Sequence, residues 1–240
     1  MPPSIQKRPS ARATVHAELR RRIIALDLPP GAPLSENELA AELGVSRTPV
    51  RESLILLGEE ELVQVFPQLG TFVSRVDLGQ VADAQFVREA VELASLRDAA
   101  ERIDAGIDPA GLAALRDVLD RQRAVEGDAE AFFPLDEEFH QTLLAVGGHA
   151  GAWRSVQSAK AHLDRARRLG LRTVSPVADL VAQHTAVVDA LEGGDAGAAE
   201  AALRAHLRAV FADVELIRAT SPELFADEGR PTRRVVASWR

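Results

Sequence analysis

The chain has 240 residues, of which 46% are hydrophobic and 27% charged, and its formal net charge is −8. This length suits one small and one medium domain, and no apolar run is long enough to predict a transmembrane helix or the core of a signal peptide. Cysteine is absent, which excludes disulfides and thiolate metal sites.

Residues 35–57 have the pattern of two short helices joined by a tight turn. Apolar residues recur at helical spacing on both sides of Gly44, which can adopt the left-handed conformation that the turn needs. Ser35 and Glu38 form a capping box that predicts the start of the first helix, and Ser46 is the expected cap of the second. The pattern predicts a helix-turn-helix.

The second of these helices has the features of a DNA-recognition helix. Forked cationic and short polar side chains at a helix N-terminus can contact phosphates and base edges in the major groove. Two β-rich runs, 62–65 and 71–73, follow and predict a two-stranded wing with a glycine-bearing turn. The residues expected to contact DNA are Ser35, Glu36, Asn37, Ser46, Arg47, Thr48, Arg51 and Gly70.

From residue 77 onward helical periodicity replaces the β-rich pattern. Helices are predicted at roughly 78–104, 109–126, 129–146, 151–169, 176–192 and 195–218. Their short connections imply antiparallel neighbours, and Ser175 is the expected N-cap of the helix that starts at Pro176. The predicted fold is mostly α. A winged helix-turn-helix at 12–76 precedes an antiparallel bundle of about six helices at 77–219, and 220–240 form a flexible tail.

The negative charge belongs to the predicted bundle. Residues 1–76 contain nine Lys and Arg and nine Asp and Glu, whereas residues 77–240 contain nineteen and twenty-seven. A neutral DNA-binding domain must rely on the local placement of arginine, so we expect a salt-sensitive specific complex. A DNA-binding protein without an export signal is expected in the cytoplasm, with no membrane partner.

Three histidines interrupt the apolar faces of three different predicted helices. His140 lies four residues after Asp136, so both side chains share one helix face. His184 and His206 lie in the middle of the apolar stripes of the last two helices. A single such histidine is usually a hydrogen-bonded core residue. Three together, with a carboxylate, suit a divalent metal with nitrogen and oxygen ligands such as zinc, nickel, manganese or iron. Structural histidines remain the alternative.

Several of these motifs resemble the GntR family of bacterial transcriptional regulators. The matching residues in the first third are Pro30-Gly31, Leu39-Ala40, the segment Gly44-Val45-Ser46-Arg47-Thr48-Pro49-Val50-Arg51-Glu52, and Gly70-Thr71-Phe72-Val73. Phe139-His140, Gln183-His184 and Ala205-His206-Leu207 resemble the FCD ligand domain of the FadR-type branch. Many members of this branch hold a metal with one Asp and three His, and the resemblance implies Asp136, His140, His184 and His206 as ligands, with zinc favoured.

The same resemblance implies an effector contact. Arg88 matches the arginine that such domains often use against a ligand carboxylate, although a surface ion pair with Glu92 would explain it equally simply. Arg165, Arg167, Arg168 and Arg172 resemble segments of sugar-acid regulators, but form a solvated face in the simpler interpretation. His16 and His162 lie on no clear apolar stripe and are expected at the surface or partly buried, and His149 is expected in an exposed loop.

These observations predict a regulator, not an enzyme. We expect a homodimeric repressor whose winged helix binds a short palindromic operator, and whose bundle holds a metal and a small carboxylate effector such as a sugar acid. One alternative is a regulator with structural histidines and an acyl-type or metal-free effector. A metal-dependent hydrolase is a third hypothesis, but it leaves the helix-turn-helix unexplained.

Overall fold

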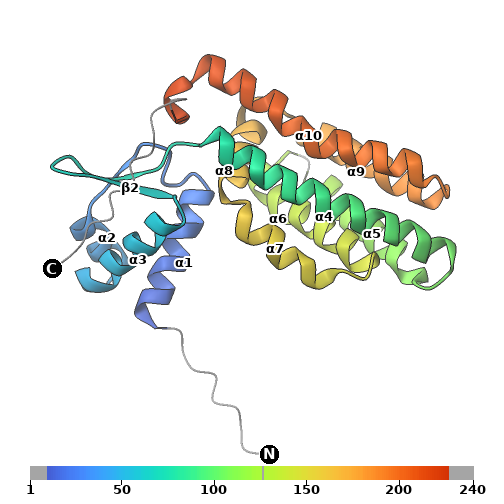
Figure 1. The fold of residues 1–240 in the computed structure, drawn as a ribbon, viewed down its shortest axis with the longest axis horizontal. Helices are drawn as coiled ribbons and strands as arrows, with labels where there is room; N and C mark the ends of the chain where they lie inside the picture. The colour runs from blue at the N-terminus through green and yellow to red at the C-terminus, as the bar shows by residue number, and fades with distance from the viewer. Residues whose placement is uncertain (1–9, 126, 227–240) are drawn as a thin grey trace, which may run out of the picture. The chain divides into compact units, whose positions relative to one another are not determined.

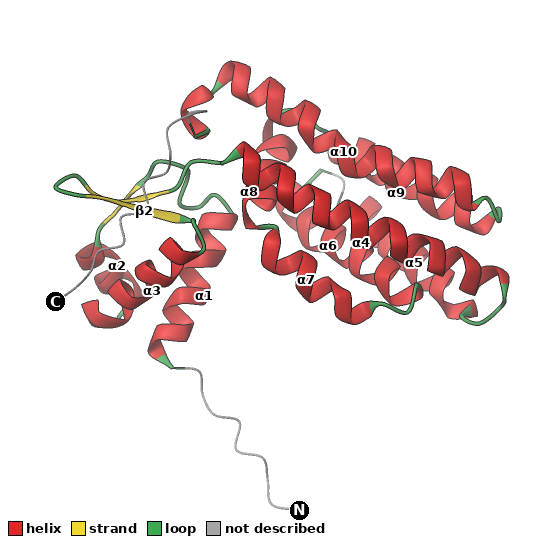
Figure 2. Cartoon of the chain, in the orientation of Figure 1, coloured by secondary structure: helices red, strands yellow, loops and turns green. Residues whose placement is uncertain are grey.

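The computed structural model describes residues 10–125 and 127–226, which form two compact units. The first contains the residues up to Asp77 together with 223–226, and the second contains Leu78–Pro222 (Figure 1). Helix dominates both units, and strands occur in the first (Figure 2). The predicted mostly α architecture is confirmed. No helix in the described ranges is long and apolar enough to cross a membrane.

Three helices form the body of the first unit: α1 (Ala11–Ile24), α2 (Glu36–Leu43) and α3 (Arg47–Glu59). Gly44 ends α2 with a φ of +66°, the left-handed conformation expected of this turn. The Ser35 hydroxyl accepts a hydrogen bond from the Glu38 amide at the start of α2, at 3.4 Å. Ser46 occupies the N-cap position of α3, but its side chain makes no capping hydrogen bond, so that expectation was wrong.

The wing of the first unit contains one strand more than the sequence predicted. Strands β2 (Val63–Phe66) and β3 (Gly70–Val73) form the expected antiparallel hairpin. The two-residue strand β1 (Pro33–Leu34) pairs with the other edge of β3 and gives the order β1-β3-β2. Two residues are too few for an alternating pattern, which is why β1 was missed.

The segment after α10 was expected to be flexible from residue 220. In the structure Pro222–Leu224 form a short 3-10 helix, and Phe225, which is 3% exposed, pairs with Val76 as an isolated parallel bridge. The beginning of this segment is therefore an ordered part of the first unit. The remainder of the predicted tail, 227–240, lies outside the described residues.

The second unit is the helical bundle. Its helices are α4 (Leu78–Asp104), α5 (Pro109–Ala124), α6 (Ala129–Val146), α7 (Trp153–Ala159), α8 (Ala161–Thr173), α9 (Val177–Glu192) and α10 (Ala196–Thr220), with a 3-10 turn at Ala150–Ala152. Helices α9 and α10 lie side by side, and α10 also packs against α4 (Figure 1). Leucine, valine and phenylalanine side chains from α4, α5, α6, α9 and α10 form one continuous buried core.

Two local predictions in the bundle were wrong. The single helix expected at 151–169 is divided into α7 and α8 at Lys160, whose backbone is not helical (φ −93°, ψ +9°). The Lys160 ammonium is buried there between the carboxylates of Glu137 and Asp164, at 2.5 and 2.6 Å. Ser175 is not a cap: α9 begins one residue later than expected, and the Ser175 hydroxyl donates to Asp213.

Candidate metal centre and DNA-contact residues

Asp136, His140, His184 and His206 form one buried cluster inside the bundle. The first two come from α6, and the others from α9 and α10. Each offers one ligating atom, and these four atoms lie within 4.8 Å of one another. Helical periodicity explains the convergence, because each residue lies on the inward face of its helix. The structure thus brings together all four residues that the sequence singled out.

The ligating atoms of the cluster point at a common centre. The Nε2 atom of His206 lies 3.2 Å from Nε2 of His184 and 3.3 Å from Nε2 of His140. Asp136 Oδ1 is 3.7 and 3.9 Å from the Nε2 atoms of His184 and His140. This oxygen has no hydrogen-bond partner among the described residues. A buried acceptor without a donor is costly, so the site needs a positive group that the four residues do not supply.

The outer nitrogen of each imidazole contacts a side-chain oxygen. The Nδ1 partners are Glu92 Oε2 for His140 at 2.6 Å, Gln122 Oε1 for His184 at 3.0 Å and Gln183 Oε1 for His206 at 2.8 Å. Hydrogen-bond acceptors at this position fix the tautomer of a metal-binding histidine. None of these three partners was predicted as part of the site.

The tautomers follow from the chemistry of these partners. An ionised carboxylate only accepts, so His140 donates its Nδ1–H to Glu92. The Gln122 amide nitrogen donates to the Leu135 carbonyl at 3.0 Å, which turns the Gln122 oxygen toward His184. In their neutral forms His140 and His184 therefore carry lone pairs on Nε2, and these lone pairs face each other across the cluster.

Burial and neighbouring charge set the protonation of the cluster. Burial lowers the pKa of His184 from 6.5 to about 3, and that of His206 falls well below its usual value for the same reason. Burial alone would raise the pKa of Asp136, but the charges of Arg167 and the nearby histidines outweigh it and hold the pKa well below 3.8. His184 and His206 are therefore neutral imidazoles beside the ionised carboxylate of Asp136, and groups in these states can bind a divalent cation.

Arg167 connects Asp136 to a second buried group of charges. Its guanidinium donates to Asp136 Oδ2 and, at 3.2 Å, to Glu137 Oε1. Glu137 in turn pairs with Lys160 at the junction of α7 and α8. One member of the arginine cluster thus contacts the metal-site candidate, whereas Arg168 and Arg172 pair with Glu130 near the surface.

Arg88 is buried beside the cluster. Only 2% of its side chain is exposed, and Nε donates to Glu92 at 2.6 Å, so the pair is buried and not the surface ion pair considered above. One of the two terminal guanidinium nitrogens of Arg88, Nη2, has no hydrogen-bond partner in the described part of the chain. Arg88 and His206 line a narrow cleft between α4, α8, α9 and α10. An anion in this cleft would accept the hydrogen bonds that Nη2 of Arg88 can donate.

The remaining histidines lie apart from the cluster. His149 is 45% exposed and pairs with Asp98 at 2.6 Å, and His16 pairs with Glu60 at 2.7 Å. His162 is 3% exposed, so the expectation of a surface or partly buried position was wrong. Every residue from 161 to 166 at the start of α8 is buried, so the burial of His162 did not depend on an apolar stripe.

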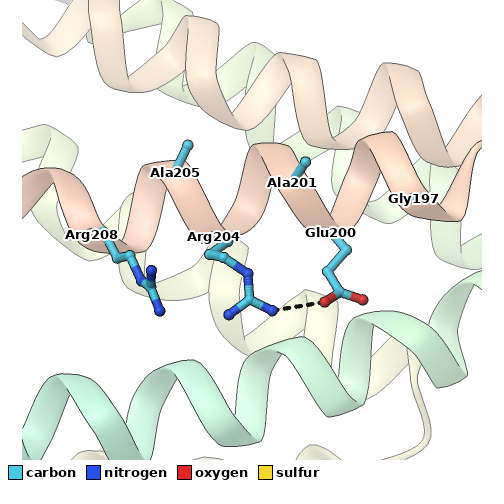
Figure 3. A pocket seen from close by; sticks show the side chains of 6 residues that line it. All are labelled: Gly197, Glu200, Ala201, Arg204, Ala205 and Arg208. Carbon is cyan, nitrogen blue, oxygen red and sulfur yellow. Dashed lines mark hydrogen bonds and ion pairs between the residues drawn. The ribbon is translucent and has the colours of Figure 1, made fainter.

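A second hollow lies along α10 (Figure 3). Its lining residues are Gly197, Glu200, Ala201, Arg204, Ala205 and Arg208. Arg204 donates to Glu200 at 2.8 Å within α10 (Figure 3). Arg204 and Arg208 also donate to Glu89, at 2.6 and 2.8 Å, and these two ion pairs join α10 to α4. No histidine is among the residues that line this hollow.

The expected DNA-contact residues lie at the N-terminal ends of α2 and α3 and at the wing. Asn37, Ser46, Arg47, Thr48 and Arg51 are exposed, Ser35 and Glu36 are half-buried, and Gly70 starts β3 with a φ of +118°. Their exposure is what a DNA-contacting surface requires.

The arginines of α3 are not free in this surface. Arg51 makes a two-pronged ion pair with Glu36, from Nε to Oε1 and from NH2 to Oε2, both at 2.9 Å. Arg47 NH2 donates to Glu36 Oε2 at 3.2 Å. One carboxylate at the start of α2 therefore orients both guanidinium groups of α3, the predicted recognition helix.

The two units match two family models. The model of bacterial regulatory proteins of the gntR family matches residues 11–73, and the FCD domain model matches residues 83–209. The chain belongs to the GntR family. It is a transcriptional regulator of the FCD-containing type and not an enzyme.

Relatives and solved structures agree with this assignment. An uncharacterized HTH-type transcriptional regulator of Streptomyces ambofaciens is 57% identical, covering 95% of this chain and 96% of its own. The HTH-type transcriptional repressor RspR of Escherichia coli is 36% identical over 89% of this chain and 93% of its own. A solved GntR regulator from a Rhodococcus species has a TM-score of 0.67 and 26% identity, covering 88% of this chain and 99% of that one.

Proposed function

We propose that this regulator binds a palindromic operator as a homodimer and responds to a small carboxylate through a metal centre in its FCD domain. The convergence of three imidazole Nε2 atoms and the unpartnered Asp136 Oδ1 carries the metal part of the proposal. A dimer would place one winged helix on each half-site. The name of the Escherichia coli relative, a repressor, favours repression.

The residues present suit a divalent metal. Asp136, His140, His184 and His206 would hold it, and the outer contacts to Glu92, Gln122 and Gln183 would orient the imidazoles. Zinc is favoured by this nitrogen and oxygen set, and nickel, manganese and iron share the preference. When bound, the metal would supply positive charge and open coordination positions for an anionic ligand.

The effector part of the proposal rests on Arg88. Its buried NH2 group lacks an acceptor among the described residues and faces the same cleft that His206 lines. A ligand carboxylate would accept hydrogen bonds from this group. Hydrogen bonds between a buried guanidinium and a carboxylate select a ligand by its geometry as well as by its charge. Arg167 lines the cleft too, but Asp136 and Glu137 already occupy its guanidinium group.

The metal proposal is tested by elemental analysis of purified protein and of single-histidine variants. His184→Ala and His206→Ala should each lower the metal content and the melting temperature together, because ligation energy is also folding energy. His149→Ala is the matched control, since His149 is exposed and lies outside the cluster. Metal-free protein that zinc, nickel and manganese all fail to stabilise would instead indicate structural histidines joined by an imidazole–imidazole hydrogen bond.

The DNA proposal is tested at α3. Arg47→Ala or Arg51→Ala should weaken operator binding by about 1–3 kcal/mol where the side chain contacts a base, with the fold unchanged. The operator would be selected from random-sequence duplexes, and affinity measured by fluorescence anisotropy. Undiminished operator affinity in both variants would exclude α3 as the recognition helix.

A further inference from the structure

The cleft beside His206 has ends of opposite character. Arg88 and Arg167 are tied to the histidine cluster through Glu92 and Asp136. Asp213, which Ser175 contacts, lies two helical turns beyond His206 along α10 and so marks the other end. Leucine and valine side chains form the walls between the ends: Leu171, Leu180, Leu207 and Val210. A ligand of this cleft therefore meets a cationic group first, then aliphatic walls, then a carboxylate.

The cationic end demands an anion. The side chain of Arg88 is 2% exposed, and it donates a hydrogen bond to Glu92 through Nε alone. The NH2 group is buried without an acceptor among the described residues, and burying a guanidinium donor without an acceptor is costly. A carboxylate is the simplest group to satisfy it.

The far end demands a hydrogen-bond donor. Asp213 is half-buried, and the Ser175 hydroxyl lies 2.8 Å from both of its carboxylate oxygens. A hydroxyl has one proton to donate, so the carboxylate keeps capacity to accept further hydrogen bonds. No Lys or Arg in the described ranges forms an ion pair with Asp213. A second carboxylate placed here would face the charge of Asp213 directly.

The fold makes room for Asp213 at this position. A Cβ at residue 170 would lie 2.7 Å from Asp213 Oδ2, so the glycine lets the carboxylate lie against α8 in this position. Glycine is disfavoured within a helix relative to alanine, and Gly170 lies inside α8. The close approach of Gly170 and the Ser175 contact hold the carboxylate in place from two directions.

The spacing of the two ends along α10 suits an extended ligand. Asp213 lies seven residues after His206, which is two helical turns, so both residues share the face of α10 that lines the cleft. Two turns correspond to about 10 Å between their backbones. The cleft itself has a volume of only about 30 Å³, so a linear acid that spans this distance would have to push the aliphatic walls apart.

We propose that Asp213 makes this cleft selective for linear monocarboxylates whose far end carries a hydroxyl donor, and that it rejects the corresponding dicarboxylates. This inference rests on the proposed effector site, which it narrows to hydroxy monoacids of the sugar-acid type. The acid group binds at Arg88, and the terminal hydroxyl donates to Asp213. An ammonium terminus offers the same donor chemistry, so the test separates the two.

The test compares acids that differ only at the last carbon. Metal-loaded full-length protein is titrated calorimetrically with threonate and tartrate, xylonate and xylarate, and gluconate and glucarate. One of these pairs should have the length that fits the cleft. In that pair the monoacid should bind at least about tenfold tighter than the diacid, because the second carboxylate of the diacid is repelled by Asp213. A further set, 6-hydroxyhexanoate, 6-aminohexanoate and adipate, separates a hydroxyl from an ammonium and a carboxylate terminus.

Variants at the far end assign the selectivity to Asp213. Asp213→Asn keeps an oxygen that accepts from Ser175 but removes the charge, so the preference for the monoacid should fall at least about fivefold through tighter binding of the diacid. Glu215→Gln is the control, because it removes the same charge from an exposed position two residues further along α10. Its preference should match that of the parent, and melting temperatures verify that both variants are folded.

The outcomes separate this inference from the proposed function. Diacids that bind as tightly as their monoacids, or an unchanged preference in Asp213→Asn, would overturn the selectivity assigned to Asp213. Stronger binding of 6-aminohexanoate than of 6-hydroxyhexanoate would overturn the assignment of a hydroxyl donor to the far end. The carboxylate site at Arg88 would survive these results. If no acid of either set binds, the proposed effector site is itself wrong and this inference falls with it.

Discussion

At the scale of single residues, one carboxylate orients both arginines that are predicted to contact DNA. Glu36 accepts from Arg51 through two parallel hydrogen bonds and from Arg47 through a third. Side chains of this length lose rotamer entropy when they bind, and a fixed guanidinium loses less. Glu36 is thus better suited to orienting these arginines than to contacting phosphates, which its own charge repels.

Replacing Glu36 should separate specific from non-specific DNA binding. Glu36→Gln should weaken operator binding by about 1–2 kcal/mol, because Arg47 and Arg51 are no longer fixed. Affinity for unrelated duplex should stay constant or rise, since a negative charge has been removed near phosphate. Glu38→Gln is the control, because Glu38 lies on the same helix, is exposed and forms no ion pair with either arginine. Equal changes in both affinities for Glu36→Gln would contradict an orienting role.

Glu92 gives a second residue-scale prediction, on acid stability. Arg88 and His140 outweigh the effect of burial and lower the pKa of Glu92 from 4.5 to about 2. Because the folded pKa is depressed, the unfolded chain takes up the proton first, and the stabilisation is lost as pH falls from about 4.5 toward 2. At about 1.4 kcal/mol per pH unit, the effect is on the order of 3 kcal/mol.

Urea unfolding of metal-free protein between pH 6 and pH 3 measures this effect. The free energy of unfolding should fall less steeply below pH 4.5 in Glu92→Gln than in the parent, because the variant lacks the titrating group. Glu138→Gln, whose carboxylate pairs with Arg121 at the surface, serves as the comparison. Parallel curves for the parent and Glu92→Gln would show that the Glu92 pair does not contribute to the pH dependence.

At the scale of elements, close helix contacts depend on glycine. Gly147 ends α6, and an added Cβ would overlap the backbone carbonyl oxygen of Ser95 on α4. Because α4 supplies Glu92 and α6 supplies His140, this contact supports the candidate metal centre. A backbone atom cannot move aside as a flexible side chain can.

Gly147→Ala should therefore destabilise the bundle by about 1–3 kcal/mol, the usual cost of overpacking. Gly151→Ala is the matched control, since a Cβ added at Gly151 would meet no described atom within 4 Å and little change is expected. Thermal unfolding followed by circular dichroism measures both. An unchanged melting temperature in Gly147→Ala would mean that α4 and α6 can separate at this point without loss.

The same elements show what a sequence can and cannot predict. Helical spacing placed His140, His184 and His206 on inward faces, so the cluster followed from local pattern. The outer contacts did not, because Gln122 and Gln183 each meet a histidine of another helix, and the packing of the helices decides these contacts. The break at Lys160 was missed for a related reason. No glycine or proline marks it, and the pairing of its ammonium with Glu137 comes from another helix.

At the scale of the whole molecule, the predicted DNA-contacting residues and the proposed acid site belong to different units. Glu36, Arg47 and Arg51 lie in the first, whereas Arg88 and the cluster lie in the second. Any effect of an acid on operator binding is then a coupling free energy between two sites, and such coupling is reciprocal. The factor by which acid changes operator affinity must equal the factor by which operator changes acid affinity.

This reciprocity can be measured with the acid that binds most tightly. Operator affinity is determined with and without saturating acid, and acid affinity with and without saturating operator duplex. The two ratios should agree, at about 5- to 150-fold for typical allosteric coupling. Arg88→Lys keeps the charge but not the forked geometry, so it should weaken acid binding while operator affinity without acid stays normal. If the two ratios differ, or if Arg88→Lys responds to acid as the parent does, the acid acts somewhere other than the Arg88 cleft.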